Sequence, residues 1–248
     1  MPDALLDLVL GSRCAVCRRP GRAVCPTCLQ QLPRRAAPAW PTPCPPGLAP
    51  PLAVGEYDGP LKALVNAHKE QGRFALARPL GDLLAVAVAG HLPPAGPPGR
   101  VGGRVLLVPV PSRRAVVRRR GHDPLLRVAG RAAGRLRSSG VLASVVRPLR
   151  TTRAAEDQAG LGAAARTRNL EGSMAGPDPG AVARLVFREQ PVLVVVVDDV
   201  ITTGATVREA QRALEEAGVP VAGIATVAAT RRLHTGPVVQ PLPRDSRP

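Results

Sequence analysis

Two adjacent carboxylates and a threonine-rich turn follow the most apolar segment of the chain. Residues 192–197 read Val-Leu-Val-Val-Val-Val, Asp198 and Asp199 come next, and a Thr-Thr-Gly-Ala-Thr turn occupies 202–206. An unbroken apolar run of this length is typical of a strand buried on both faces of a parallel sheet. Ligands of such sheets bind beyond the carboxyl ends of the strands. We therefore expect the carboxylates and the turn to lie in a binding site.

The turn has the features of a phosphate site. Gly204 allows a positive φ and a close approach of the backbone to a ligand, and successive N–H groups in such a turn form an anion-binding nest. The helix expected after it adds partial positive charge at its N-terminus. Carboxylates repel phosphate, so the two acids suit ribose hydroxyls, directly or through Mg²⁺. The predicted ligand is phosphoribosyl pyrophosphate, and the residues predicted to bind it here are Asp198, Asp199, Thr202, Thr203, Gly204, Ala205 and Thr206. The alternative is a solvated turn with a helix N-cap at Thr206.

A second turn follows the apolar segment 104–110, which we expect to be another strand. Pro111, Ser112 and Arg113 come directly after it, and a backbone turn with a guanidinium suits pyrophosphate. Asp198, Asp199 and Arg113 are therefore the candidate catalytic residues. The arginines at 118–120 add further positive charge, with a solvated basic helix as the equal alternative.

Four of the five cysteines form two C-x₂-C pairs, separated by seven residues. Paired cysteines at this spacing, in a chain expected to be cytoplasmic, indicate a metal site rather than disulfides. Four thiolates favour tetrahedral, structural Zn²⁺. The predicted ligands are Cys14, Cys17, Cys25 and Cys28. Cys44 stands alone among prolines as a bystander thiol or an auxiliary ligand.

The net charge of +16 comes almost entirely from arginine, because Lys62 and Lys69 are the only lysines. A codon bias toward Arg, Ala, Gly and Pro explains this, and an anionic partner such as a phosphorylated small molecule or nucleic acid is the alternative. Aromatic residues make up only 2% of the chain, which argues against base-stacking modules. No apolar run reaches 18 residues, and the first residues lack the pattern of a signal peptide. We expect a cytoplasmic protein.

Strand, helix and strand patterns at 192–197, 206–217 and 219–228 form a βαβ unit, which predicts an α/β fold with a parallel sheet flanked by helices. Further helices are expected over 60–72, 74–92 and 124–137, a strand over 141–146, and a long loop over 148–172. The predicted organisation is an N-terminal helix with a cysteine knuckle (1–32), a proline-rich linker (33–52), the α/β domain (53–232) and a disordered tail (233–248).

The segment 194–206 resembles the signature of type I phosphoribosyltransferases: four apolar residues, two acids, two apolar residues, then Thr-Gly-small-Thr. The resemblance implies that the acids contact ribose hydroxyls and that the turn binds the 5′-phosphate. It also implies a hood, a variable lid over the acceptor, contributed here by residues 148–172.

Other segments are similar to ComF proteins. The matching blocks are Tyr57–Val65 with Lys69 and Arg73, Val108–Arg113 with 118–123, and 153–170, to which the cysteine pairs add. One departure is His-Asp at 122–123, where many members have Phe-Asn. The resemblance implies hood or substrate roles, which we assign to Tyr57, Lys62, Lys69, Arg166 and Asn169.

Three functions fit these residues. The first is Mg²⁺-dependent transfer of a phosphoribosyl group to a nitrogen acceptor. The second, implied by the ComF resemblance, is a non-catalytic accessory role in DNA uptake, with single-stranded DNA or DNA-processing proteins as partners. The third is a nucleotide-sensing regulator. The sequence names no acceptor and does not decide among the three.

Overall fold

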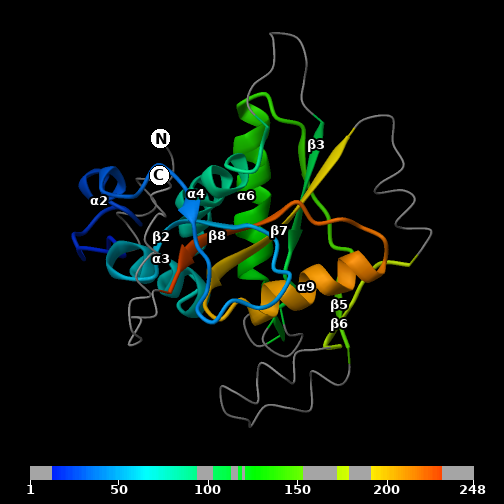
Figure 1. Cartoon of the computed structure of the whole chain (residues 1–248). Coiled ribbons are helices and arrows are strands. Elements are labelled where there is room, and N and C mark those ends of the chain that lie inside the picture. The colour runs from blue at the N-terminus through cyan, green and yellow to red at the C-terminus, as the bar shows by residue number, and fades with distance from the viewer. Residues whose placement is uncertain are drawn as a thin grey trace, which may run out of the picture.

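The computed structural model describes residues 13–93, 103–112, 117–118, 121–152, 172–178 and 191–230. In these ranges a six-stranded sheet has the order β1-β2-β8-β7-β3-β4, and β5 and β6 form a separate pair (Figure 1). The sheet strands are β1 (Ala37–Pro38), β2 (Pro51–Glu56), β3 (Arg104–Pro109), β4 (Ala143–Val145), β7 (Val192–Ile201) and β8 (Gly223–Ala229), and the separate pair is β5 (Arg150–Thr151) and β6 (Met174–Ala175). The helices are α2 (Pro26–Gln30), α3 (Gly59–Glu70), η1 (Phe74–Leu76), α4 (Ala77–Ala89), α6 (Pro124–Ser138) and α9 (Ala205–Glu216).

Five neighbouring strands of the large sheet run parallel, and only β1 is antiparallel to its neighbour. The predicted α/β fold with a mostly parallel sheet is therefore confirmed. Among the described residues, no helix has both the length and the apolar character needed to cross a membrane.

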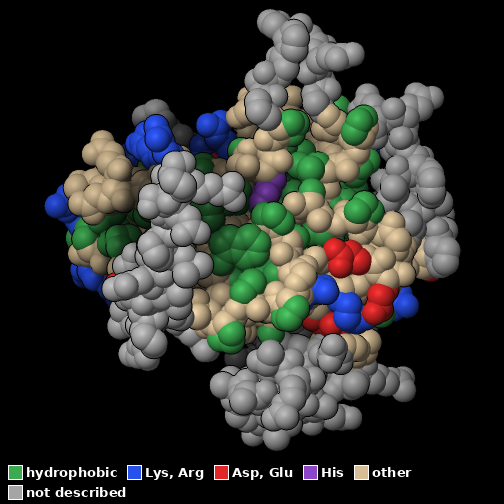
Figure 2. Space-filling model, in the orientation of Figure 1, with side chains coloured by type: hydrophobic (Ala, Val, Ile, Leu, Met, Phe, Trp, Pro, Cys, Tyr) green, Lys and Arg blue, Asp and Glu red, His purple; other side chains and the backbone are tan. Residues whose placement is uncertain are grey.

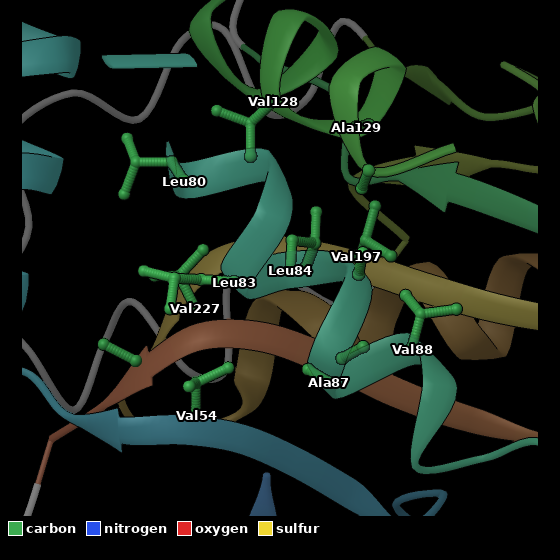
Figure 3. Close-up of a cluster of buried hydrophobic side chains, with 14 of the residues drawn as sticks. Val54, Leu80, Leu83, Leu84, Ala87, Val88, Val128, Ala129, Val197 and Val227 are labelled. Carbon is green, nitrogen blue, oxygen red and sulfur yellow. The ribbon is translucent and has the colours of Figure 1, made fainter. Parts of the chain in front are cut away.

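The two faces of the sheet are covered by different helices. Val195 and Val197 pack with α3, α4 and α6, a core that Figure 3 shows in close-up. Val194 and Val196, whose side chains alternate with those two, pack with α9 instead. All four valines are at most 3% exposed, which explains why β7 is apolar at every position before Asp198.

The order of the strands makes the chain connections reverse between β3 and β7. From β3 the chain passes through α6 to β4 at one edge, whereas from β7 it passes through α9 to β8 on the opposite side. The connections thus leave β3 and β7 in opposite directions, and Pro109 at the end of β3 lies beside Val197. Such a reversal is where open α/β sheets bind ligands.

Several elements differ from their predicted bounds; the strand predicted over 219–228, for example, spans Gly223–Ala229, and the one predicted over 141–146 spans Ala143–Val145. The strand predicted over 192–197 continues through both carboxylates to Ile201, because Val200 and Ile201 still pair with β8. The helix predicted over 74–92 begins as the short turn η1 and ends at Ala89. The expected N-terminal helix before the cysteines, most of the loop 148–172 and the tail lie outside the described residues.

The proline-rich segment 33–52 packs onto the domain rather than spanning open solvent. It contains β1 and the first two residues of β2, and the side chains of Leu48 and Ala49 are buried against α9. Proline is tolerated there because β1 lies at the edge of the sheet and Pro51 is the first residue of its strand. The division into four segments otherwise remains a prediction.

Candidate functional site

Asp198 and Asp199 lie on opposite faces of β7, near its carboxyl end. Asp199 continues the face that packs on α3, α4 and α6, and Asp198 continues the face toward α9, where it pairs with Thr226 of β8. The backbone N–H of Asp199 donates to the Oδ1 atom of Asp198 at 2.8 Å. The two acids therefore flank the strand and can contact one ligand from two directions.

Lys69, in the last turn of α3, forms an ion pair with Asp199. Its Nζ atom lies 2.8 Å from Asp199 Oδ2. The pair closes one side of a small pocket lined by Val65, His68, Lys69, Leu80, Pro124, Leu125, Val128, Asp199 and Val227. His68 fixes this end of α3, because its ring nitrogens contact the backbone oxygens of Arg73 and Pro124, each at 3.2 Å. Of the candidate hood residues within the described ranges, Lys69 is thus the one with an ion pair to a carboxylate of the site.

Burial raises the pKa of Asp198 to about 8, and the charge of Asp199 raises it further, while a backbone hydrogen bond and Lys69 act in the opposite direction. Near neutral pH the Asp198 carboxyl is therefore largely protonated. A protonated carboxyl donates one hydrogen bond and accepts others, which suits a ribose hydroxyl or a ligand oxygen.

The turn after β7 presents backbone N–H groups at the start of α9. Gly204 has φ +73°, in the left-handed region, and as the N-cap residue it supplies no side-chain oxygen. Thr203 Oγ1 accepts from the Ala205 N–H at 3.4 Å, and Gly204 O accepts the N–H of Arg208 at 2.9 Å. A helix start whose N-cap residue has no side chain, next to exposed Thr202, is suited to bind an anion.

The turn after β3 is tied to the start of α6. Val110 N–H donates to Val197 O at 3.0 Å, which places Pro111 and Ser112 beside the end of β7. The Ser112 hydroxyl donates to Asp123 Oδ1 at 3.1 Å, and the same oxygen accepts the Leu126 N–H at 3.1 Å. Sequence reasoning gave Asp123 no role, although an Asp before a Pro at a helix start is the pattern of an N-cap. Arg113 lies outside the described residues.

Two other candidate hood residues, Tyr57 and Lys62, lie in the described part of the chain. Tyr57 follows β2, and its hydroxyl donates to Asn66 Oδ1 of α3 at 2.6 Å. Lys62 is exposed in the first half of α3. Arg166 and Asn169 lie outside the described residues.

The two cysteine pairs converge into one cluster. The sulfur atoms of Cys14, Cys17, Cys25 and Cys28 all lie within 4.8 Å of one another. Four Zn–S bonds of about 2.3 Å in a tetrahedron place the sulfurs about 3.8 Å apart, so the cluster can hold a zinc ion. Cys44 is not part of it, and its exposed thiol lies against Pro45 O instead.

Local structure explains how the pairs meet. Cys14 and Arg19 close a tight turn through a 2.8 Å backbone hydrogen bond, with Arg18 in a left-handed conformation at φ 64°. Burial opposes ionisation of Cys14, but backbone N–H donors outweigh it and lower the pKa to about 6. Burial and the neighbouring thiols raise the pKa of Cys28 to about 12. Four thiolates here would therefore need a cation among them.

Residues 192–239 match the family model of the phosphoribosyl transferase domain. The match takes in β7, the threonine-rich turn, α9 and β8, which are the elements that carry both carboxylates and the helix N-terminus. A search of curated proteins found no significant match. The match supports a ribose phosphate as the ligand of this site.

Proposed function

We propose that this protein binds phosphoribosyl pyrophosphate at the carboxyl ends of β3 and β7. The main support for this proposal is the position of Asp198, Asp199 and the turn at 202–206. They lie inside the matched segment, at the reversal of strand connections, and beside a helix N-terminus whose N-cap residue has no side chain.

Each part of the ligand has a matching group. The 5′-phosphate binds the N–H groups and hydroxyls of residues 202–206, and the ribose hydroxyls contact Asp198 and Asp199. The pyrophosphate binds the turn at 110–112, with Arg113 as its counter-charge. Asp199 is the carboxylate that would hold Mg²⁺, in place of the Lys69 ammonium that lies 2.8 Å from its Oδ2 atom. When bound, Mg²⁺ neutralises charge on the leaving pyrophosphate.

The proposed reaction is transfer of the phosphoribosyl group to a nitrogen acceptor. The acceptor nitrogen forms a bond to C1 of the ribose, and the C1–O bond to pyrophosphate breaks with its electron pair on the leaving oxygen. The protein contributes mainly position and charge: the turn anchors one end of the sugar, the two acids orient its hydroxyls, and Arg113 stabilises pyrophosphate. Closure of residues 148–172 would exclude water.

Within this class, we propose a ComF-like protein. Support comes from the occurrence in one chain of the four-cysteine cluster and the phosphoribosyl transferase match, and from the contact of Lys69 with the signature acid. In this proposal zinc is structural, since all four sulfur ligands come from the protein and leave no coordination position open.

Isothermal titration calorimetry with phosphoribosyl pyrophosphate and Mg²⁺ tests the ligand. The wild type should bind, and the double variant Asp198→Asn/Asp199→Asn should bind at least about tenfold more weakly, a change of about 1.4 kcal/mol. Equal binding by the two proteins, or no binding by the wild type, would refute the assignment. Release of pyrophosphate with a panel of nitrogen nucleophiles then separates an enzyme from a sensor.

A second candidate function is an accessory role in DNA uptake. Its supporting observation is a group of exposed arginines around the cysteine cluster, Arg13, Arg18, Arg19 and Arg22. Figure 2 shows Lys and Arg gathered on the side where α2 lies, whereas those near α9 are interspersed with acids. Affinity for single-stranded DNA should fall steeply with salt if these arginines contact phosphates. Lack of binding at low salt would exclude this function.

A further inference from the structure

The proline-rich segment Pro41–Ala49, which we call the proline strap, crosses the N-terminal end of α9. Figure 1 shows this blue segment running from the side of α2 and β2 toward the orange helix. Pro41 is buried, and Leu48 and Ala49 are 7% and 8% exposed within the core beneath α9. The strap is thus packed against the helix that begins at the proposed phosphate turn.

The strap contacts the turn at Gly204. A Cβ atom added to this glycine would come within 2.9 Å of Pro41 Cγ and 3.4 Å of atoms in Leu48 and Pro45. A real side chain does not tolerate the first distance. Glycine is therefore required at position 204 for two reasons: the positive φ and the close approach of the strap. The shape of the turn depends on the strap as well as on its own sequence.

Two side chains of α9 fasten the strap from the helix side. Gln211 is 3% exposed; its Nε2 donates to Gly47 O, and its Oε1 accepts the Ala49 N–H, both at 2.9 Å. Arg208, three residues earlier on the same helix face, donates through Nε to Pro46 O at 2.9 Å. A third bond, from Gln211 Nε2 to Glu215 Oε1 at 2.8 Å, orients the amide. The buried amide thus satisfies two backbone groups that would otherwise lack partners.

We propose that Gln211 is a positioning residue for the phosphate turn and acts through the proline strap. The inference rests on the proposed function, because it assumes that residues 202–206 bind a phosphate. Gln211 holds the strap, the strap packs on Gly204, and Gly204 sets the direction of the N–H groups at the start of α9. Donors held in place before binding lose less entropy when the ligand arrives, so loosening the strap weakens phosphate binding without touching the ligand.

The test compares two substitutions on α9. Gln211→Met keeps the length of the side chain but removes its hydrogen bonds to the strap. Arg212→Met is the matched control, because the neighbouring Arg212 bonds instead to Glu209, Glu216 and Met174 O, away from the strap. The probes are ribose 5-phosphate affinity by calorimetry, well below the melting temperature of each protein, and amide hydrogen exchange of the ligand-free proteins over residues 203–210.

Gln211→Met should weaken ribose 5-phosphate binding by about tenfold and speed exchange at Ala205 and Arg208. Arg212→Met should lower the melting temperature but keep the affinity and the exchange rates at the turn. Unchanged exchange and affinity in Gln211→Met, or an equal loss of affinity in Arg212→Met, would overturn the role of Gln211. Absence of binding of both ribose 5-phosphate and phosphoribosyl pyrophosphate by the wild type would instead refute the proposed function. Hydrogen exchange would still report whether the strap and the turn are coupled.

Discussion

At the scale of single residues, the site rests on a carboxyl that keeps its proton near neutral pH. Burial of the Asp198 carboxyl, which lies on a strand paired with β8, and the charge of the neighbouring Asp199 raise its pKa to about 8. In the unfolded chain the same group has the ordinary aspartate pKa of 3.8. Over the interval between these values the native state holds a proton that the unfolded state has lost.

This difference predicts a pH dependence of stability. Because the native state binds more protons, the free energy of unfolding should fall as pH rises from about 4 to about 8, by up to about 1.4 kcal/mol per pH unit from this group. Asp198→Asn keeps the oxygen that accepts the Asp199 N–H but does not titrate. Denaturant unfolding should therefore show that the free energy of unfolding falls less between pH 5 and pH 7.5 in Asp198→Asn than in the wild type. An equal fall in the two proteins would contradict the raised pKa of Asp198.

The ion pair between Lys69 and Asp199 predicts a second residue-scale effect. Lys69→Met should weaken binding of phosphoribosyl pyrophosphate by about tenfold, because it removes positive charge from a site that receives a polyanion. Lys69→Arg keeps the charge and should retain most of the affinity in calorimetry. The Lys69 side chain is 39% exposed, so solvent screens the pair and we expect little change in stability. Wild-type affinity in Lys69→Met, or an equal loss in Lys69→Arg, would contradict this role.

At the scale of elements, the βαβ unit from β7 to β8 could be predicted from sequence because its signals are local. The apolar run, the Thr-Gly turn and the spacing of Val207, Ala210 and Leu214 each report on neighbours in the chain. The residue at which β7 ends could not be predicted from sequence, since the extension of the strand through Asp198 and Asp199 depends on pairing with β8. The packing of the strap on α9 was also missed, because it joins residues more than 150 positions apart.

The cluster of Cys14, Cys17, Cys25 and Cys28 gives a prediction at the same scale. Metal analysis of purified protein should find one zinc ion per chain, matching the single cluster in the described residues. Cys25→Ser should lose this zinc and lower the melting temperature, because buried thiols would be left without their cation. Cys44→Ser, which changes the cysteine outside the cluster, should retain it. Loss of zinc in Cys44→Ser, or a full zinc content in Cys25→Ser, would contradict the assigned ligands.

At the scale of the whole molecule, the order of the strands decides which turns become neighbours. The sequence suggested two strand ends with polar turns, but no local pattern states that β3 lies beside β7 or that the connections reverse between them. That adjacency brings Val110 beside Val197, the residue before Asp198. The structure likewise joins the cysteine segment to the α/β domain, since the guanidinium of Arg73, between α3 and η1, donates to Arg13 O.

The most direct test of the central claim is a crystal structure of the protein with phosphoribosyl pyrophosphate and Mg²⁺, at concentrations that calorimetry shows to be saturating. We predict the 5′-phosphate against the N–H groups of residues 203–206 and the ribose hydroxyls within hydrogen-bond distance of Asp198 and Asp199. A ligand bound elsewhere on the chain, with the turn after β7 empty, would contradict the account.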